Sequence, residues 1–238
     1  PVSLVDVPGQ GVGLSATKGL GLGDLLLVTP PLAYITEEDL ELDEGGDDDG
    51  DGSELLDAKF EALQAVLLSK KYTRAEHAWL DALTEVAVAE EDDSNVADGG
   101  KTQPQARDAL RAGAVPELST LIMKEGEDTD GGQAESTLEP SYAKRLEGIV
   151  QANAYEAASE DLDLAMVGTG AAPASEVMGL WPHYAMLNHS CMPNTISYPH
   201  KGMLITRASR ANISNAAPLT ANYIGDLVLS PLDVRREA

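Results

Sequence analysis

Hydrophobic positions in the first 35 residues form short runs that glycine and proline separate. The runs read SLVDV, GQGVGLSAT, KGLGLGD and LLLVTPPLAYI. Short apolar runs bounded by such residues are typical of strands joined by tight turns. We therefore expect a β-rich N-terminal piece.

The spacing of hydrophobic residues changes to that of helices further along the chain. Two apolar sets recur at helical spacing, the first comprising Leu55, Leu56, Phe60, Leu63, Val66 and Leu67, and the second comprising Ala78, Leu80, Leu83, Val86 and Ala87. We predict two helices separated near Lys71, with Thr73 as the N-cap of the second.

The second half of the chain begins helical and ends in short strands. A helix is predicted over 141–158, and a short helix near 106–112 precedes it within polar, glycine-rich sequence. The runs NTISY, GMLITRA and PLTANYIG indicate strands near the C-terminal end. The pattern predicts an α+β fold in which two β-rich ends form one domain around a helical middle.

Charge is unbalanced and clustered. The chain has 16 Lys and Arg against 40 Asp and Glu, a net charge of -24, much of it within residues 37–54 and 90–100. Repulsion from phosphates argues against a direct nucleic-acid partner and favours basic proteins or peptides. We expect the two acidic runs to be solvated loops, with an acidic docking surface as the alternative.

Cysteine content and hydropathy limit the class of protein. One cysteine excludes an internal disulfide framework, and the sequence has neither an apolar run long enough to cross a bilayer nor a secretory signal. We predict an intracellular protein of the nucleus or cytoplasm, without a membrane partner.

Residues 11–16 read GVGLSA and match the G-x-G-x-x-A pattern of dinucleotide-binding proteins. That pattern has to open a helix whose N-terminus holds the pyrophosphate. The sequence continues TKGLGLGD, and its glycines disfavour a helical turn. We expect a glycine-rich turn, or a turn that brings backbone close to a different ligand.

Histidine and cysteine side chains offer two further chemistries. His183, His189, Cys191 and His200 could supply zinc ligands, although neither CxxC nor HxxxH spacing occurs. In an extended segment His189 and Cys191 would point to the same side, which allows contact. A cysteine nucleophile with a histidine base and a packed, inert thiol both remain open.

The order of the motifs is more informative than any one of them. The segments GLWPHYAMLNHSCMPNT, TRASRANI, LTANYIGD and PLDVRRE follow one another, so that an NHSCxPN motif at Asn188–Asn194 precedes an LTxxY motif at Leu219–Tyr223. This arrangement resembles the C-terminal half of SET-domain lysine methyltransferases. The segment PGQGVGLSATKGLGLGDLLLVTPPLAYI near the start resembles the N-terminal piece of that domain. QANAY (Gln151–Tyr155) resembles a segment of the SET-and-MYND-like and plant or algal SET branches, here without the MYND finger.

The resemblance covers about half of the chain and implies a particular fold. It implies small curved sheets with a C-terminal pseudoknot, interrupted by a helical, acidic insertion. The SET domain would comprise an N-terminal part at 1–36 and a C-terminal part at 141–238. Residues 37–140 would be the insertion.

The resemblance also implies S-adenosylmethionine as methyl donor and a lysine of a basic protein, such as a histone tail, as acceptor. Tyr223 matches the catalytic tyrosine. The donor-binding positions are Gly11, Val12, Gly13, Asn153, Asn188 and His189. The lysine channel would be lined by Ala154, Tyr155, Ala185 and Tyr223.

Several positions depart from the family pattern. Gln10 and Val12 stand where relatives often carry basic residues, Asn215–Pro218 replaces the usual Gly-Glu, and Ala185 is smaller than the usual serine. Cys191 would bind zinc only together with downstream cysteines outside this chain. The alternative function is therefore a non-catalytic SET-fold module that docks basic proteins.

Overall fold

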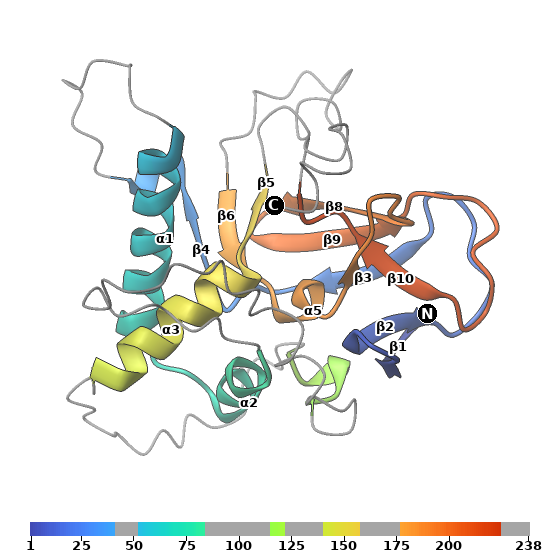
Figure 1. The fold of residues 1–238 in the computed structure, drawn as a ribbon, viewed down its shortest axis with the longest axis horizontal. Helices are drawn as coiled ribbons and strands as arrows, with labels where there is room; N and C mark the ends of the chain where they lie inside the picture. The colour runs from blue at the N-terminus through green and yellow to red at the C-terminus, as the bar shows by residue number, and fades with distance from the viewer. Residues whose placement is uncertain (41–51, 84–114, 122–139, 158–176, 225–238) are drawn as a thin grey trace, which may run out of the picture.

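A computed structural model describes residues 1–40, 52–83, 115–121, 140–157 and 177–224, which form an α+β fold of three small sheets and flanking helices (Figure 1). The α+β class predicted from the sequence is confirmed. The strands are β1 (Val2–Val7), β2 (Gly11–Ala16), β3 (Leu25–Thr29), β4 (Ala33–Thr36), β5 (Tyr155–Ala157), β6 (Val177–Leu180), β7 (Asn188–His189), β8 (Thr195–His200), β9 (Met203–Ala208) and β10 (Pro218–Ala221). The helices are α1 (Gly52–Ser69), α2 (Arg74–Ala82), α3 (Pro140–Asn153) and α5 (Pro182–Ala185), with 3-10 turns η1 (Glu37–Asp39) and η4 (Leu118–Leu121).

The first sheet joins the two ends of the described chain. Its strand order is β1-β2-β10-β7. β10 pairs antiparallel with β2, where Leu219 faces Leu14, and parallel with β7, where Thr220 faces Asn188. A strand from the C-terminal part therefore fills the space between an N-terminal strand and the NHSC segment.

The other two sheets are also built from distant segments. One has the order β3-β9-β8 and the other β4-β6-β5. Helix α1 runs alongside β4 (Figure 1). The buried Lys59 of α1 donates to the Glu156 carboxylate of β5 at 2.5 Å, so an ion pair ties the helix to the third sheet.

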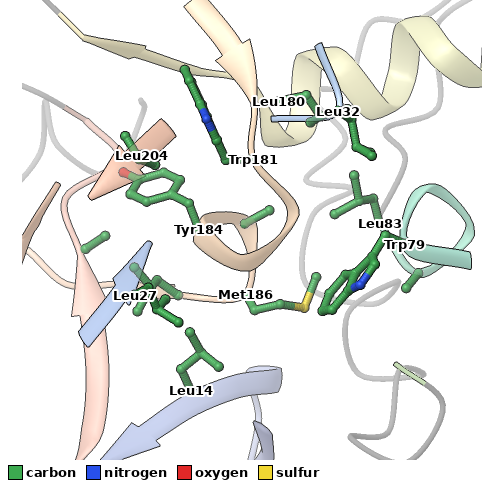
Figure 2. Close-up of a cluster of buried hydrophobic side chains, with 14 of the residues drawn as sticks. Leu14, Leu27, Leu32, Trp79, Leu83, Leu180, Trp181, Tyr184, Met186 and Leu204 are labelled. Carbon is green, nitrogen blue, oxygen red and sulfur yellow. The ribbon is translucent and has the colours of Figure 1, made fainter. Parts of the chain in front are cut away.

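The core is centred on the short helix α5 and the residues around it. Figure 2 shows Trp181 and Tyr184 beside Leu204 of β9, whereas Met186 extends towards Trp79 of α2. Both tryptophans are fully buried, and buried aromatic side chains contribute strongly to core stability. The α2 helix of the acidic middle region is therefore part of the same core as the sheets.

Gly179 has a packing role in that core. A Cβ at this position would lie 2.6 Å from the Trp181 ring and 2.9 Å from Tyr34 Cβ. The glycine lets the indole pack directly on the backbone of β6. The Trp181 indole then donates its N–H to the Gly202 carbonyl at 3.2 Å.

The predicted helices and strands agree with the structure except at the end of one helix. Two helices flank Lys71 as predicted, and Thr73 is an N-cap that forms a capping box with Glu76. The helix predicted over 141–158 ends at Asn153, because Tyr155–Ala157 pairs with β6 instead. The glycine-rich run KGLGLGD forms one β-bridge, from Leu20 to Ile213, and a turn before β3, and it contributes no further strand. The helix predicted near 106–112 lies outside the described residues.

No helix in the described ranges is both long enough and apolar enough to cross a membrane.

His183 is a buried polar residue at the start of α5. Its Nδ1 lies 3.3 Å from the Thr29 hydroxyl, and its ring packs edge-on against Trp79 at a centroid distance of 4.8 Å. Within the described part of the chain its Nε2 has no hydrogen-bond partner. Burial lowers the pKa of His183 from 6.5 to about 4, so the folded protein holds the neutral imidazole.

We expect His183 to make stability pH-dependent. Between pH 6.5 and about 4 the unfolded chain binds a proton that the folded site excludes. The free energy of unfolding therefore decreases as the pH is lowered through this range. The full loss is about 3 kcal/mol. Urea unfolding of the wild type and of His183→Gln at pH 7 and pH 4.5 isolates this contribution. The wild type should be more stable than His183→Gln at pH 7, and the difference between their free energies of unfolding should be smaller at pH 4.5. A constant difference would contradict it.

Candidate functional site

Asn194 holds the NHSC segment to β10 through its side chain. Its Oδ1 accepts the Thr220 N–H at 2.9 Å, and its Nδ2 donates to the Pro218 carbonyl at 2.8 Å. Thr195 Oγ1 donates to the Thr220 carbonyl at 2.8 Å, and the Ser190 N–H donates to the Ala221 carbonyl at 2.9 Å. The Asn194 amide therefore satisfies backbone groups of β10 in the way that the backbone of a paired strand would.

His189 links the NHSC motif to the LTxxY tyrosine. Its Nδ1 accepts the Tyr223 N–H at 3.1 Å, and the two rings lie 5.5 Å apart. Burial lowers the pKa of His189, so the ring is neutral near pH 7. With Nδ1 as acceptor, the neutral ring carries its proton on Nε2.

The same tautomer decides between the two interpretations of Cys191. His189 Nε2 lies 3.3 Å from Cys191 Sγ, so the contact that the sequence allows does occur. Nε2 carries the proton and donates to the sulfur, and it cannot accept the thiol proton without giving up its tautomer. The arrangement therefore opposes a cysteine nucleophile with His189 as base and favours a packed thiol.

Tyr223 presents its phenolic oxygen at the end of this network. The side chain is 41% exposed, and its hydroxyl donates to the Leu187 carbonyl. Because the hydrogen is directed at Leu187, a ligand near this oxygen would meet its lone pairs. Such an oxygen can accept a weak CH···O contact.

The Asn188 amide lies against the glycine turn from the start of the chain. A Cβ at Gly13 would lie 2.5 Å from Asn188 Nδ2 and 2.7 Å from a Val7 methyl group, so only glycine fits. Asn188 is 5% exposed, yet no hydrogen bond to its amide is found in the described part of the chain. In the described residues the one side-chain N or O atom that is both buried and unpartnered is His183 Nε2. The Asn188 amide is therefore reached by solvent and is available to a polar ligand.

Gly11 and Val12 contribute backbone to the same region. Gly11 adopts φ 72° where the β1–β2 turn ends, and it pairs with Val7. The Val12 side chain is in the hydrophobic core, so a ligand could use the backbone of this residue but not its side chain. Residues 11–16 form strand β2 and open no helix, which excludes the dinucleotide-binding interpretation.

Three aromatic side chains, Tyr155, Tyr184 and Trp181, lie together, and Tyr184 is close to Tyr223. Tyr155 lies 4.4 Å from Tyr184 and 6.1 Å from Trp181, by ring centroids. Burial, followed by the proximity of Tyr155 and Tyr223, raises the pKa of Tyr184 well above its usual range. Tyr184 is 6% exposed, and its hydroxyl has no hydrogen bond to any described residue.

Tyr184 and Trp181 are site residues that the motif comparison did not identify. A compositional signal points to them, because the chain has only 7 Tyr, 2 Trp and 1 Phe. Two of these rings occur within the four residues WPHY, which three residues separate from the start of the NHSC motif.

The remaining predicted site residues lie on neighbouring elements. The Asn153 amide donates to the Ile149 carbonyl at 2.8 Å, which ties it to α3. Ala154 and Tyr155 lead into β5, and the buried Ala185 ends α5. Tyr155 donates to the Ser197 carbonyl at 3.1 Å, so its ring is anchored between β5 and β8.

The proposed zinc ligands are not gathered in one place. No group of three or more His, Cys, Asp or Glu side chains in the described ranges is placed to hold a metal ion. His183 is buried beside Thr29, whereas His200 is exposed at the end of β8.

No protein-family model matches this chain, and no curated protein matches it either.

The turn before β10 contains an alanine with a positive φ. Ala216 has φ 62°, in the left-handed region, and its N–H donates to the Ala16 carbonyl at 2.8 Å. An alanine in this region costs about 1 kcal/mol or more. The conformation is one that glycine adopts without strain.

Ala216→Gly should raise the free energy of unfolding by about 0.5 kcal/mol, after allowing for the extra freedom of glycine in the unfolded chain. Ala217→Gly is the matched control at the next position, which has no positive φ. It should lower stability by about 0.5 to 1 kcal/mol. Urea titration of both variants checks the opposite signs, and the same sign for both would refute the assignment of strain.

Asn194→Ala should lower the free energy of unfolding by about 2 kcal/mol, because two backbone groups of β10 lose their partners. Asn215→Ala removes an exposed amide from the preceding turn and should change stability by less than about 0.5 kcal/mol. Chemical denaturation measures both. Equal effects would show that Asn194 is not the residue that secures β10.

Proposed function

We propose that the protein is an S-adenosylmethionine-dependent protein-lysine N-methyltransferase with a SET fold. The position of β10 between β2 and β7 supports the pseudoknot part of this proposal. The observation that carries the function is the Asn188 amide, which lies against Gly13, has no hydrogen bond from the described residues and adjoins the His189–Tyr223 pair.

The groups around Asn188 suit a polar, compact donor. The Asn188 amide, the backbone of Gly11–Gly13 and His189 would hold it, with Asn153 as a neighbouring contributor from α3. When bound, S-adenosylmethionine supplies a methyl group on a sulfonium. A neutral lysine amine would attack that carbon, the carbon–sulfur bond would break as the nitrogen–carbon bond forms, and the new ammonium would release a proton to water.

Tyr223 would act on the methyl group and the amine. Its oxygen offers lone pairs because the hydroxyl hydrogen is directed at Leu187. These lone pairs would orient the polarised methyl group through CH···O contacts. Alignment of an in-line displacement and exclusion of water are the main requirements of this reaction.

The aromatic group beside Tyr223 would form the path for the lysine side chain. Tyr155 and Tyr184 would provide aromatic surface for an aliphatic stem and an ammonium group, with the buried Trp181 packed edge-on against Tyr155. The small residues Ala154 and Ala185 would leave room for the chain. The unpartnered Tyr184 hydroxyl offers a hydrogen bond inside this path.

Charge near the site differs from the charge of the whole chain. Residues 177–224 contain Lys201, Arg207 and Arg210 and no Asp or Glu, whereas the whole chain carries -24. Attraction of a basic, histone-like substrate would therefore come from the acidic residues outside this segment. It would raise the rate of encounter more than the affinity at the site.

The second candidate is a non-catalytic SET-fold module that docks basic proteins. Gln10 and Val12 favour it, because neither supplies a cation for the donor carboxylate and the Val12 side chain is in the core. The two candidates differ in whether the folded protein binds the donor.

Calorimetric titration with S-adenosylmethionine and methylation of a histone-tail peptide test the proposal together. Tyr223→Phe should lower the methylation rate by about 100-fold with little change in donor Kd. Asn188→Ala should weaken donor binding by about tenfold, through loss of a buried polar contact. Tyr34→Phe is the matched control, since Tyr34 is as exposed as Tyr223, at 44%.

Absence of donor binding by the folded wild-type protein would reject the enzyme and leave the docking module. Equal losses of donor binding and methylation in Tyr223→Phe would assign Tyr223 a structural role. Either result would be read against Tyr34→Phe, which should match the wild type in both assays.

A further inference from the structure

The β3-β9-β8 sheet has an outer face made mainly of apolar side chains. Residues directly opposite one another in the register share a face, and Leu25, Arg207 and Ile196 form one such row, as Val28, Ile205 and Tyr198 form another. We define these six residues and Met203 as the outer apolar face.

The two faces of this sheet have opposite burial. Leu27, Leu204 and Thr206, on the inner face, are buried. On the outer face Leu25 is 46% exposed, Val28 44% and Ile196 57%. A sheet face is normally polar where it meets water, and contiguous exposed apolar surface marks an interaction site.

Arg207 places a fixed positive charge at the centre of this face. Its Nε donates to the Tyr198 hydroxyl at 3.0 Å, and an amino group of the guanidinium donates to the Gly23 carbonyl at 2.9 Å. Both partners are neutral. Within the described residues no ion pair neutralises Arg207.

The charge of the surrounding segment indicates which partner fits. Residues 177–224 carry three basic and no acidic side chains. Asp24, which precedes Leu25 of β3, accepts the Gly21 N–H, and within the described residues no ion pair joins it to Arg207. An acidic group would therefore be attracted to Arg207 on this face. A second copy that paired through the same face is a poor occupant, because it would bring a second Arg207 guanidinium towards the first. A neutral apolar segment would leave the half-buried guanidinium without a counter-charge.

We propose that the outer apolar face is a docking surface for an amphipathic peptide segment of another protein, whose carboxylate pairs with Arg207. The apolar side chains of the segment cover Leu25, Val28 and Ile196. The carboxylate receives the guanidinium in a charge-assisted hydrogen bond. This surface is separate from the Asn188–Tyr223 site, and its test does not depend on methyltransferase activity.

Selection of random short peptides displayed on phage against the wild-type protein tests the proposal. Enriched peptides should combine apolar residues with Asp or Glu. Fluorescence anisotropy of a synthesised peptide should show binding weakened by about tenfold or more in Val28→Glu, Ile196→Glu and Arg207→Gln. Amidation of the peptide carboxylate should weaken binding to the wild type and have no further effect on Arg207→Gln.

Matched controls separate the face from general charge effects. Leu22→Glu adds the same charge at an exposed residue outside the sheet, and Arg210→Gln removes one positive charge after β9. Both should bind like the wild type. Circular dichroism and thermal melting test whether each variant is folded. If either Val28→Glu or Ile196→Glu does not fold, the other still tests the face.

Three results would overturn the proposal. One is selection of no peptide or of basic peptides. A second is unchanged affinity in folded Val28→Glu and Ile196→Glu. The third is a wild-type dimer in sedimentation velocity that Val28→Glu dissociates, because it would make a second copy the occupant.

Discussion

The pairing of β10 with both β2 and β7 is the constraint on which the rest of the site depends. β10 connects an N-terminal strand to the NHSC segment, and the Asn194 amide holds its backbone where β7 has too few residues to do so. Loss of this pairing would separate Gly13 from Asn188 and His189 from Tyr223. Stability and the geometry of the candidate site therefore rest on the same hydrogen bonds.

The site combines well-fixed groups with groups that still lack partners. His189 is held in one tautomer by Tyr223, and Tyr155 is anchored to Ser197. In contrast, the Asn188 amide and the Tyr184 hydroxyl belong to residues that are 5% and 6% exposed, and neither group has a hydrogen bond from the described residues. Fixed neighbours around unsatisfied polar groups are what a preorganised ligand site requires, because the cost of burial is already met by the fold.

Local patterns predicted local structure well. Helical spacing and the Thr73 cap locate α1 and α2 because both signals act within a few residues. β5 was missed because Tyr155–Ala157 continues the apolar pattern of α3, and its extended form depends on pairing with β6. The motif order predicted Asn188, His189 and Tyr223 as site residues, and the structure places them close together. Their contacts, and the roles of Asn194 and Tyr184, depend on partners distant in sequence and could not be read from spacing.

The central position of β10 also constrains how the chain folds. Leu219 pairs with Leu14, so this contact closes a loop that contains most of the protein, and contacts of such long range form slowly. During synthesis the facing edges of β2 and β7 stay unpaired until β10 has been made. Exposed strand edges promote association between chains, so the nascent protein is most prone to aggregate just before its last described strand emerges.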